Sequence, residues 1–266
     1  MIKLDKKYNV LMPIKNQNLK RLGRNLDGGY VVDINIIENC KTLITLGLGN
    51  DWSFEKDYLK INSDAKVHIY DHTVSTKPYL KEILKYSRRL ITFRSNIKAL
   101  IDRTKYLFDF LKILHSNKIN FYKEKITSET SSDSFSNITK IFKRLVVKEK
   151  TILKIDIEGG EFEILSEIIN YADRIEMLIF EFHNLDKNEL IFLESIEKLL
   201  KYFNIIHLHG NNHCGRTKGG LPIALEMTMI NKKNQINKIE YIKNFPREHL
   251  DFANNPYKED MVFYFE

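Results

Sequence analysis

Three acidic residues stand close together where a predicted strand gives way to a helix. The stretch TILKIDIEGGEFEIL, residues 151–165, carries Asp156 and Glu158 before a glycine pair and Glu161 after it. The β-branched and apolar residues before Asp156 predict a buried strand, the glycines predict a turn, and the apolar spacing that follows predicts a helix. Open α/β sheets bind ligands at the carboxyl ends of their strands. The acids are therefore placed to bind a ligand or move a proton, and a polar cap on a buried strand is the alternative.

Further acids and histidines end other predicted strands. The candidates are, in chain order, Asp71, Asp156, Glu158, Glu181, His183, His207 and His209. Because the carboxyl ends of parallel strands meet at one rim, we expect these side chains to line a single crevice. Side chains two apart on a strand share a face, so Glu181 should pair with His183 and Asp156 with Glu158.

Two chemistries fit such a cluster. In the first, Asp156, Glu181 and a histidine hold a divalent ion that binds substrate oxygens and lowers the pKa of one of them. In the second no metal is present, and His183 or Asp156 is the general base that takes a proton from a hydroxyl. A set of oxygen and nitrogen ligands without cysteine favours magnesium or manganese over structural zinc.

A glycine loop precedes these strands. Residues 41–50, KTLITLGLGN, predict a strand that ends in Gly47 and Gly49, and a helix capped by Asp51 or Ser53 follows. The glycines let a ligand approach the backbone, although GxG without a third glycine argues against a pyrophosphate cofactor. Asp71, about twenty residues beyond the loop, is placed to accept hydrogen bonds from both hydroxyls of a ribose.

Strands and helices alternate along most of the chain. This alternation predicts an α/β fold, a mostly parallel sheet with helices on both faces. We expect residues 89–93 to form a short third strand and residues 96–116 a scaffold helix. Residues 222–230 and 261–265 predict strands with no helix between them, which indicates an antiparallel edge. Nearer the start, Asp27-Gly28-Gly29 predicts a tight turn into the strand 30–32.

Composition narrows the function classes. The 266 residues suffice for one α/β domain with additions, and no apolar run is long enough to span a bilayer. With no apolar leader at the start and only Cys40 and Cys214, we expect a reduced, cytoplasmic protein. The net charge of +7 is spread over lysines beside glutamates, without a basic stretch interleaved with aromatics, so we expect no nucleic-acid partner. A positive surface also suits an anionic small substrate such as a nucleotide sugar.

Together these motifs resemble the FkbM-type S-adenosylmethionine-dependent methyltransferases over roughly residues 20 to 230. The matching segments are DGGY at 27–30, LGLGNDWSFE at 46–55, KIDIEGGEFEIL at 154–165, FEFH at 180–183 and HLHGNN at 207–212. KxDxEGxE is the most specific of them. The resemblance implies a Rossmann-like seven-stranded methyltransferase sheet with a reversed strand at one edge, and methyl transfer to an oxygen.

The resemblance also implies roles for particular residues. Asp27, Gly28, Gly47, Gly49, Asp51, Asp71 and Asp156 would contact the cofactor S-adenosylmethionine, with Asp71 on its ribose. Asp156 and Glu158 would face the methyl group, and His183 would join them as a catalytic residue. Metal-dependent O-methyltransferases of this broader fold take ligands from the fourth and fifth strands, which indicates Asp156 and Glu181 here, and we extend the set to His209. The residues that line the adenine stay unassigned.

We therefore expect residues 1–40 to be an N-terminal extension with the DGGY turn and residues 41–266 to be one S-adenosylmethionine-binding domain. The expected activity is O-methylation of a sugar hydroxyl, on a nucleotide-linked or surface-polysaccharide precursor in bacterial capsule or lipopolysaccharide biosynthesis, with a heptose as one candidate. The alternatives are a metal-dependent sugar hydrolase or glycosyltransferase, and a cofactor-binding protein without catalysis. The metal requirement and a homo-oligomeric state stay open.

Overall fold

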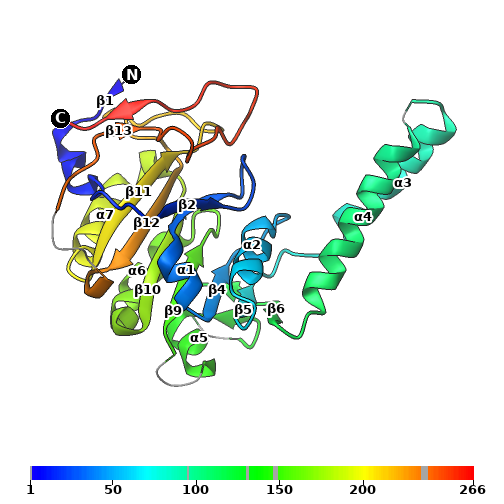
Figure 1. Cartoon of the computed structure of the whole chain (residues 1–266), viewed down its shortest axis with the longest axis horizontal. Coiled ribbons are helices and arrows are strands. Elements are labelled where there is room, and N and C mark those ends of the chain that lie inside the picture. Colours follow the sequence, from blue (N-terminus) through cyan, green and yellow to red (C-terminus); the bar gives the residue numbers. More distant parts are fainter. Residues whose placement is uncertain (1, 95, 130–131, 146–148, 235–238) are drawn as a thin grey trace.

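The computed structural model describes residues 2–94, 96–129, 132–145, 149–234 and 239–266. Its centre is a seven-stranded sheet with the strand order β11-β12-β10-β9-β4-β5-β6 (Figure 1). The strands are β4 (Thr42–Leu46), β5 (Lys66–Tyr70), β6 (Ile119–Tyr122), β9 (Thr151–Ile155), β10 (Ile175–Phe182), β11 (Phe203–Gly210) and β12 (Leu225–Asn231). The chain enters the sheet at β4, moves outward to β6, and returns through β9 to the other side.

One strand of this sheet runs against the rest. β12 is antiparallel to both β10 and β11, whereas β4, β5, β6, β9 and β10 pair in parallel. The prediction of a mostly parallel α/β sheet with a reversed strand toward one edge is confirmed. The reversed strand lies one position in from the edge, because β11 pairs with its outer side.

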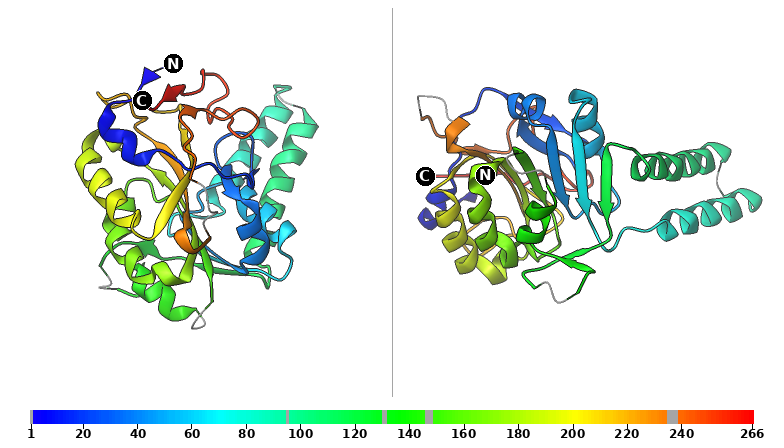
Figure 2. Two further views of the ribbon diagram at one scale, coloured as in Figure 1. Left: turned by 60° about the vertical axis from the view of Figure 1, so that its left-hand side comes forward. Right: turned by 90° about the horizontal axis from the view of Figure 1, so that it is seen from below.

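Helices cover both faces of the sheet because strand side chains alternate between two buried cores. Leu153 and Ile155 belong to the core beneath α5 (Ile138–Arg144), α6 (Glu161–Ile168) and α7 (Leu185–Leu199). Ile152 belongs to the opposite core, which α1 (Ile34–Asn39) and α2 (Ser53–Ile61) cover (Figure 2). Carboxylates stabilise two of the helix starts: the Asp33 side chain caps α1, and Glu161 and Glu163 occupy the first turn of α6.

Short elements surround the main sheet. They are β1 (Ile2–Lys3), β13 (Asn244–Phe245) and β14 (Phe263–Tyr264) in one sheet, the hairpin β2 (Leu19–Leu22) with β3 (Tyr30–Asp33), the pair β7 (Lys125–Ile126) with β8 (Phe135–Ser136), and the 3-10 turns η1 (Lys6–Leu11), η2 (Ile169–Arg174) and η3 (Lys232–Asn234). The two termini lie side by side because β1 pairs with β14. The strand expected at 261–265 thus belongs to this small sheet and not to the edge of the main one. The division at residue 40 stays a prediction.

A helical hairpin projects from the body between β5 and β6. It consists of α3 (Lys77–Ile91) and α4 (Ile97–Leu114), which pack against each other (Figures 1 and 2). The prediction of a strand at 89–93 is wrong, since apolar residues there continue the helical spacing of Leu80 and Leu84, and the third strand is β6. The predicted helix at 96–116 is confirmed, but much of its apolar surface is exposed and does not form scaffold.

Lys154 of β9 is a buried cation on the side of the sheet that α1 and α2 cover. Its ammonium lies 3.5 Å from Oε1 of the fully buried Glu55 and 5.0 Å from the centre of the Tyr30 ring. Burial lowers the pKa of Lys154, but the charges of Glu55 and Asp156 outweigh this effect and raise it, so the side chain stays charged. The ion pair joins α2 to β9, the strand that directly precedes Asp156.

We expect Lys154→Met to lower the free energy of unfolding by about 3 to 5 kcal/mol, because it leaves the Glu55 carboxylate buried without its cation. The double variant Glu55→Leu/Lys154→Met removes both charges and should regain more than half of that loss. Urea unfolding of the three proteins measures both changes. Equal losses in the single and double variants would show that the pair does not act as a unit.

Candidate functional site

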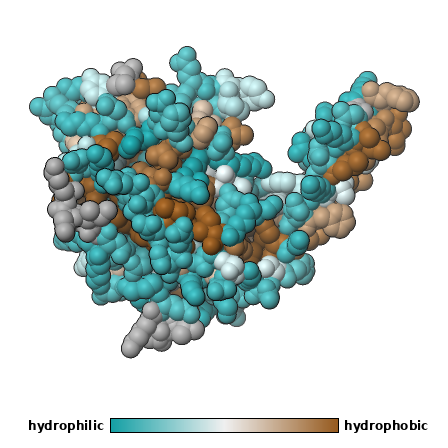
Figure 3. Space-filling view, viewed as in Figure 1, coloured by the Kyte–Doolittle hydropathy of each residue, from teal (hydrophilic) through white to brown (hydrophobic). Residues whose placement is uncertain are grey.

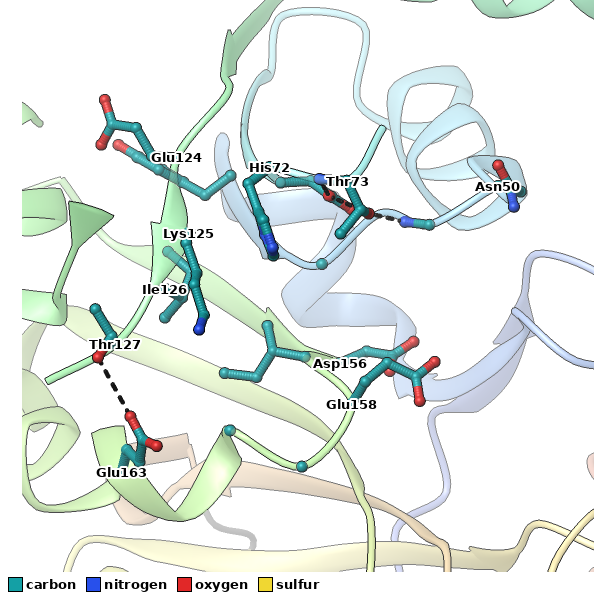
Figure 4. Close-up of a pocket in the computed structure, with 17 residues that line it drawn as sticks. Asn50, His72, Thr73, Glu124, Lys125, Ile126, Thr127, Asp156, Glu158 and Glu163 are labelled. Atoms are coloured by element: carbon teal, nitrogen blue, oxygen red, sulfur yellow. Dashed lines mark hydrogen bonds between the residues drawn. The ribbon is translucent and has the colours of Figure 1, made fainter. Parts of the chain in front are cut away.

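A cavity of about 650 Å³ opens at the carboxyl ends of β4, β5 and β9 (Figure 4). Its lining residues are Gly47, Gly49, Asn50, Tyr70, Asp71, His72, Thr73, Glu124, Lys125, Ile126, Thr127, Asp156, Ile157, Glu158, Gly159, Gly160 and Glu163. Four of the seven residues predicted to contact a cofactor are among them: Gly47, Gly49, Asp71 and Asp156. The position agrees with the rule that α/β sheets bind ligands beyond their strand ends.

The glycine loop is built to bring two strand ends together. Gly47 has a φ of +80°, and a Cβ there would lie 1.7 Å from the carbonyl oxygen of Asp156. Any side chain at position 47 would therefore push β4 and β9 apart. A Cβ on Gly49, by contrast, would meet nothing within 4 Å, so the loop leaves open space on the cavity side.

Asp71 holds this loop in place. Its Oδ2 accepts hydrogen bonds from the backbone N–H groups of Leu48 and Gly49 at 2.8 and 2.9 Å. Its Oδ1 accepts from the amide and the hydroxyl of Thr73, both at 2.6 Å, and from the amide of Val74 at 3.2 Å. Burial alone would raise the pKa of Asp71, but these bonds lower it. Both oxygens predicted to bind a ribose are thus occupied by the protein's own donors.

A second group of side chains adjoins the cavity. Asp156 follows β9, Glu158 follows two residues later in the left-handed region at φ 56°, and His183 follows β10. Among the described residues, these three form the one group of metal-binding types whose ligand atoms all lie within 4.8 Å of one another. Nε2 of His183 is 3.6 Å from Glu158 Oε2 and 4.0 Å from Asp156 Oδ1. Figure 4 shows the two carboxylates side by side at one end of the cavity.

The imidazole is oriented from behind by Glu161. Nδ1 of His183 lies 3.0 Å from Oε1 of Glu161, which is fully buried at the start of α6. The same oxygen accepts the backbone N–H of Ile157 and of Gly159, so it also shapes the turn. A carboxylate on one ring nitrogen that leaves the other nitrogen facing two acids is the usual arrangement of a metal-binding histidine. This donor set fits a magnesium or manganese ion.

Tyr30 is a site residue that the sequence alone did not reveal. Its buried hydroxyl lies 3.1 Å from Asp156 Oδ2 and 3.1 Å from Glu181 Oε2. One hydroxyl can donate only one hydrogen bond at a time, so the two carboxylates share it. The DGGY motif contained the signal, because a tyrosine directly after a glycine turn places a long polar side chain at a strand start. β3 pairs with β2 as the predicted turn suggests, and its first residue reaches the carboxylates of Asp156 and Glu181.

The acids and the histidine shift one another's protonation. Burial raises the pKa of Asp156 to about 6, although Lys154 and His183 oppose this shift. Burial and the charge of Asp156 raise the pKa of Glu181 to about 8. Burial lowers the pKa of His183, but the hydrogen bond to Glu161 and the neighbouring acids outweigh it and bring the value to about 9. At neutral pH we therefore expect Asp156 to be ionised, Glu181 neutral and His183 cationic.

The histidines of β11 lie outside this group. His209 interacts through Nδ1 with Glu226 at 3.2 Å and through Nε2 with Asp260 at 3.1 Å. His207 lies 2.8 Å from Asp251. Tyr30 links Asp156 and Glu181, but the reversed strand β12 separates β11 from β10 and keeps His209 away from both, so the predicted set of three ligands does not form. The predicted single crevice is therefore two separate features: a central site, and a set of buried histidine–carboxylate pairs that involve the C-terminal segment.

Three of the residues predicted to contact a cofactor do not line the cavity. Asp51 forms an ion pair with Arg24 at 2.6 Å and accepts the backbone N–H of Ser53. The prediction that Asp51 or Ser53 caps α2 is wrong, because Trp52 is the N-cap residue and no side chain of the described residues makes a capping hydrogen bond there. Asp27 accepts a hydrogen bond from Asn254 at 3.3 Å, and a Cβ on Gly28 would meet the Asp51 carboxylate. Gly28 and Asp51 thus join the N-terminal segment to the residue after the glycine loop, and Asp27 joins it to the C-terminal segment.

The far end of the cavity supplies residues that the sequence left unassigned. Figure 4 shows the side chains of His72 and Lys125 pointing into the space between the strand ends. The carboxylate of Glu124 beside them accepts hydrogen bonds from both terminal nitrogens of Arg144, at 2.8 and 2.9 Å, and these bonds fix its position. Arg144 in turn lies over the Tyr122 ring. No motif marks this wall, because it is assembled from the segments after β5 and β6, and its Glu124 is fixed by Arg144 of the distant helix α5.

We expect the His183 ring of metal-free protein to titrate near pH 9 in NMR spectra recorded in EDTA, against an ordinary value of 6.5. Because the folded pKa is raised, its proton stabilises the native state fully below about pH 6.5, and this contribution is lost as the pH rises through about 9. Glu161→Gln should lower the pKa by about one pH unit or more. Glu163→Gln, on the exposed side of the same helix, is the matched control. A Glu161→Gln protein that titrates like wild type would show that Glu161 does not hold the imidazole.

No protein-family model and no curated protein sequence matches the chain. Among solved structures, a putative rRNA methylase from Clostridium thermocellum matches with a TM-score of 0.39 and 12% identity over 74% of this chain and 92% of that chain. Fibrillarin, a pre-rRNA processing protein from Methanococcus jannaschii, matches with a TM-score of 0.40 and 12% identity over 74% of this chain and 68% of that chain. A predicted O-methyltransferase from Agrobacterium tumefaciens matches with a TM-score of 0.34 and 11% identity over 75% of this chain and 80% of that chain. These values are too low to support a function, so the function must come from the site.

Proposed function

We propose that the protein is an S-adenosylmethionine-dependent O-methyltransferase that acts on a sugar hydroxyl, on a nucleotide-linked or surface-polysaccharide precursor. One observation carries the proposal: Asp156 and Glu158 belong both to the cavity at the glycine loop and to the group with His183. A cofactor in the cavity and an acceptor hydroxyl at the group would therefore meet at these two carboxylates. Capsule or lipopolysaccharide biosynthesis is the proposed context, and a heptose is one candidate acceptor.

The cavity suits this cofactor in size, shape and charge. About 650 Å³ is within the range of small-molecule sites, and the open space at Gly49 lets a ligand approach the loop backbone. The ionised Asp156 and the exposed Glu158 make this end of the cavity negative, which favours a cationic sulfonium. Asp71 orders the loop, and His72 and Thr73 beside it offer further polar groups to a ribose.

Bound S-adenosylmethionine would supply an electrophilic methyl group, and the chain's own residues would prepare the acceptor. Methyl transfer needs an aligned oxygen nucleophile that loses its proton. Asp156, with a pKa of about 6, is mostly ionised at neutral pH and can accept that proton. Tyr30 fixes its Oδ2, while Oδ1 faces His183 and Glu158. His183 keeps its own proton at neutral pH, so it stabilises negative charge on the oxygen rather than acting as the base.

The donor set also accommodates the proposed metal. Magnesium or manganese held by Asp156, Glu158 and His183 would lower the pKa of a bound hydroxyl. His183 would then bind through Nε2 as the neutral imidazole, with its remaining proton on Nδ1 toward Glu161. Glu158 and His183 replace the predicted ligands Glu181 and His209 in this proposal. The two carboxylate oxygens of Glu181 accept hydrogen bonds from Tyr30 and Asn211, and His209 lies in a different cluster, beside Glu226.

The alternatives from the sequence make different demands on the same residues. A metal-dependent hydrolase or glycosyltransferase would use Asp156, Glu158 and His183 but has no need of the glycine loop. A cofactor-binding protein without catalysis would use the loop but has no need of an oriented imidazole between two carboxylates.

A cytoplasmic location and a small-molecule rather than nucleic-acid partner remain part of our proposal. None of the helices in the described residues has both the length and the apolar character needed to cross a bilayer.

Calorimetric titration with S-adenosylhomocysteine is the first test. We expect a dissociation constant in the micromolar range, about −8 kcal/mol, in EDTA as well as with manganese added back, because the cavity residues do not include all of the metal-binding group. Methyl transfer to nucleotide sugars is then assayed under the same two conditions. Activity that EDTA removes and manganese restores supports the metal. Absence of binding in both conditions would reject the methyltransferase and leave the hydrolase or glycosyltransferase.

We expect Asp156→Asn to abolish turnover while the affinity for S-adenosylhomocysteine stays within a few fold. The amide keeps the size of the carboxylate but cannot accept the hydroxyl proton, so the loss should exceed about a hundredfold in kcat. Glu163→Gln, also on the cavity wall, is the matched control and should retain near wild-type turnover. Loss of cofactor affinity together with turnover would mean that Asp156 is chiefly a binding residue.

A further inference from the structure

The hairpin of α3 and α4, residues 77–114, carries the whole net charge of the protein. We call it the arm. It contains six lysines and four arginines against one glutamate and two aspartates, a net charge of +7, and the full chain of 42 basic and 35 acidic residues also has +7. The rest of the chain is therefore neutral overall. All ten cations of the arm are exposed, and among the described residues its one ion pair joins Lys85 to Glu82 at 2.9 Å.

The arm also exposes large apolar side chains in a regular pattern. They are Leu80, Leu84 and Ile91 on α3 and Ile97, Ile101 and Phe108 on α4, between 48% and 77% exposed. On each helix the positions are i, i+4 and i+11, so the three apolar side chains lie in one stripe along the same face of the helix. Figure 3 shows hydrophobic residues along one side of the arm and hydrophilic ones along the other. An apolar patch of this extent on a soluble domain marks a surface that binds something.

The end of the arm combines both properties. Ile91 is 77% exposed, Phe93 is 97% exposed, and Ile97 is 64% exposed. Four cations surround them in the sequence: Arg88, Arg89, Arg94 and Lys98. Phe93 has a φ of 55°, in the left-handed region, and lies in the turn that follows α3.

We propose that the arm docks on the surface of a bilayer that contains anionic lipids. Exposed phenylalanine and isoleucine would enter the boundary between headgroups and acyl chains, and lysines and arginines would lie at the phosphates, as in amphipathic helices that bind membrane surfaces. Each cation near an anionic surface contributes about 1 kcal/mol. This surface binding needs no membrane-spanning segment.

Charge distinguishes this occupant from two others. A second copy of the chain would bring another +7 arm against the first, and like charges at an interface oppose association. A nucleic acid would satisfy the cations but leave the leucine, isoleucine and phenylalanine stripes exposed, since phosphate contacts need no apolar surface. An anionic bilayer complements both the charge and the apolar stripes.

The base of the arm is fixed to the glycine loop. Trp52, which directly follows the loop, packs against Tyr106 and Phe110 of α4 with ring centres 4.5 and 5.0 Å apart. The Tyr106 hydroxyl donates a hydrogen bond of 2.7 Å to the carbonyl of Asn50, which lines the cavity. α4 has 18 residues and is about 27 Å long. A docked arm would therefore hold the cavity at a set distance from the bilayer.

The test is sedimentation of the full chain with vesicles of phosphatidylcholine alone and of phosphatidylcholine mixed with phosphatidylglycerol. We expect binding to the mixed vesicles that weakens as salt is raised, and much weaker binding to the neutral ones. Arg88→Gln/Arg89→Gln should reduce the affinity about 30-fold, from about 1 kcal/mol for each cation. Ile91→Ser/Phe93→Ser should reduce it by at least about tenfold.

Matched variants on the body provide the controls. Leu190→Ser/Tyr257→Ser changes side chains that are 76% and 95% exposed, close to the 77% and 97% of Ile91 and Phe93. Lys187→Gln/Lys198→Gln removes two exposed cations from α7. Both should bind vesicles as wild type does. Circular dichroism and thermal melting of every variant check that the fold is kept, and titration with S-adenosylhomocysteine checks the cavity separately from the arm.

Three results would overturn the proposal. The first is wild-type protein that stays in the supernatant with the mixed vesicles at low salt. The second is equal loss of vesicle binding in the arm variants and the body controls. The third is a dimer in analytical ultracentrifugation that the arm variants, but not the body controls, convert to a monomer. Fluorescence anisotropy with a single-stranded RNA completes the test. If the wild-type protein binds the RNA but not the vesicles, and the arm variants lose the RNA binding, the arm is a nucleic-acid surface.

Discussion

The approach of the glycine loop to the backbone of Asp156 is the contact on which the site depends. β4 and β9 are neighbours in the centre of the sheet, and only a residue without a side chain at position 47 lets their ends come so close. Asp71 fixes the same loop from the other side with bonds to two backbone amides. The cavity and the carboxylate of Asp156 are thus parts of one rigid rim.

Around that carboxylate the protein gathers more charge than a buried site normally tolerates. Lys154 and Glu55 lie behind it, Tyr30 and Glu181 beside it, and His183 in front of it. Desolvation favours the neutral form of the acids, while the two cations hold Asp156 ionised near neutral pH. The result is one carboxylate that is ready to accept a proton or a metal, next to another that keeps its proton.

The molecule also separates its charges in space. The rim of the cavity is rich in carboxylates, whereas the net positive charge lies on the arm, which follows β5 and Asp71 in the chain. A helical hairpin at this point can project from the body without interrupting the sheet, because it begins and ends at the neighbouring strands β5 and β6. The aromatic contacts of Trp52 with α4 join the two regions mechanically.

The sequence by itself determined the sheet and the chemistry-bearing strand ends. Hydrophobic periodicity predicted β4, β5, β9, β10 and β11, and the turn at Gly159 and Gly160 placed the start of α6, because these features depend on local propensity and spacing. Tertiary structure alone decided which strand ends meet. The reversed strand β12 keeps His209 away from the site, the hairpin strand β3 brings Tyr30 to Asp156, and Arg144 of α5 fixes Glu124 on the far wall. The arm's exposed stripes show the same limit, since helical periodicity predicts an apolar face but not what covers it.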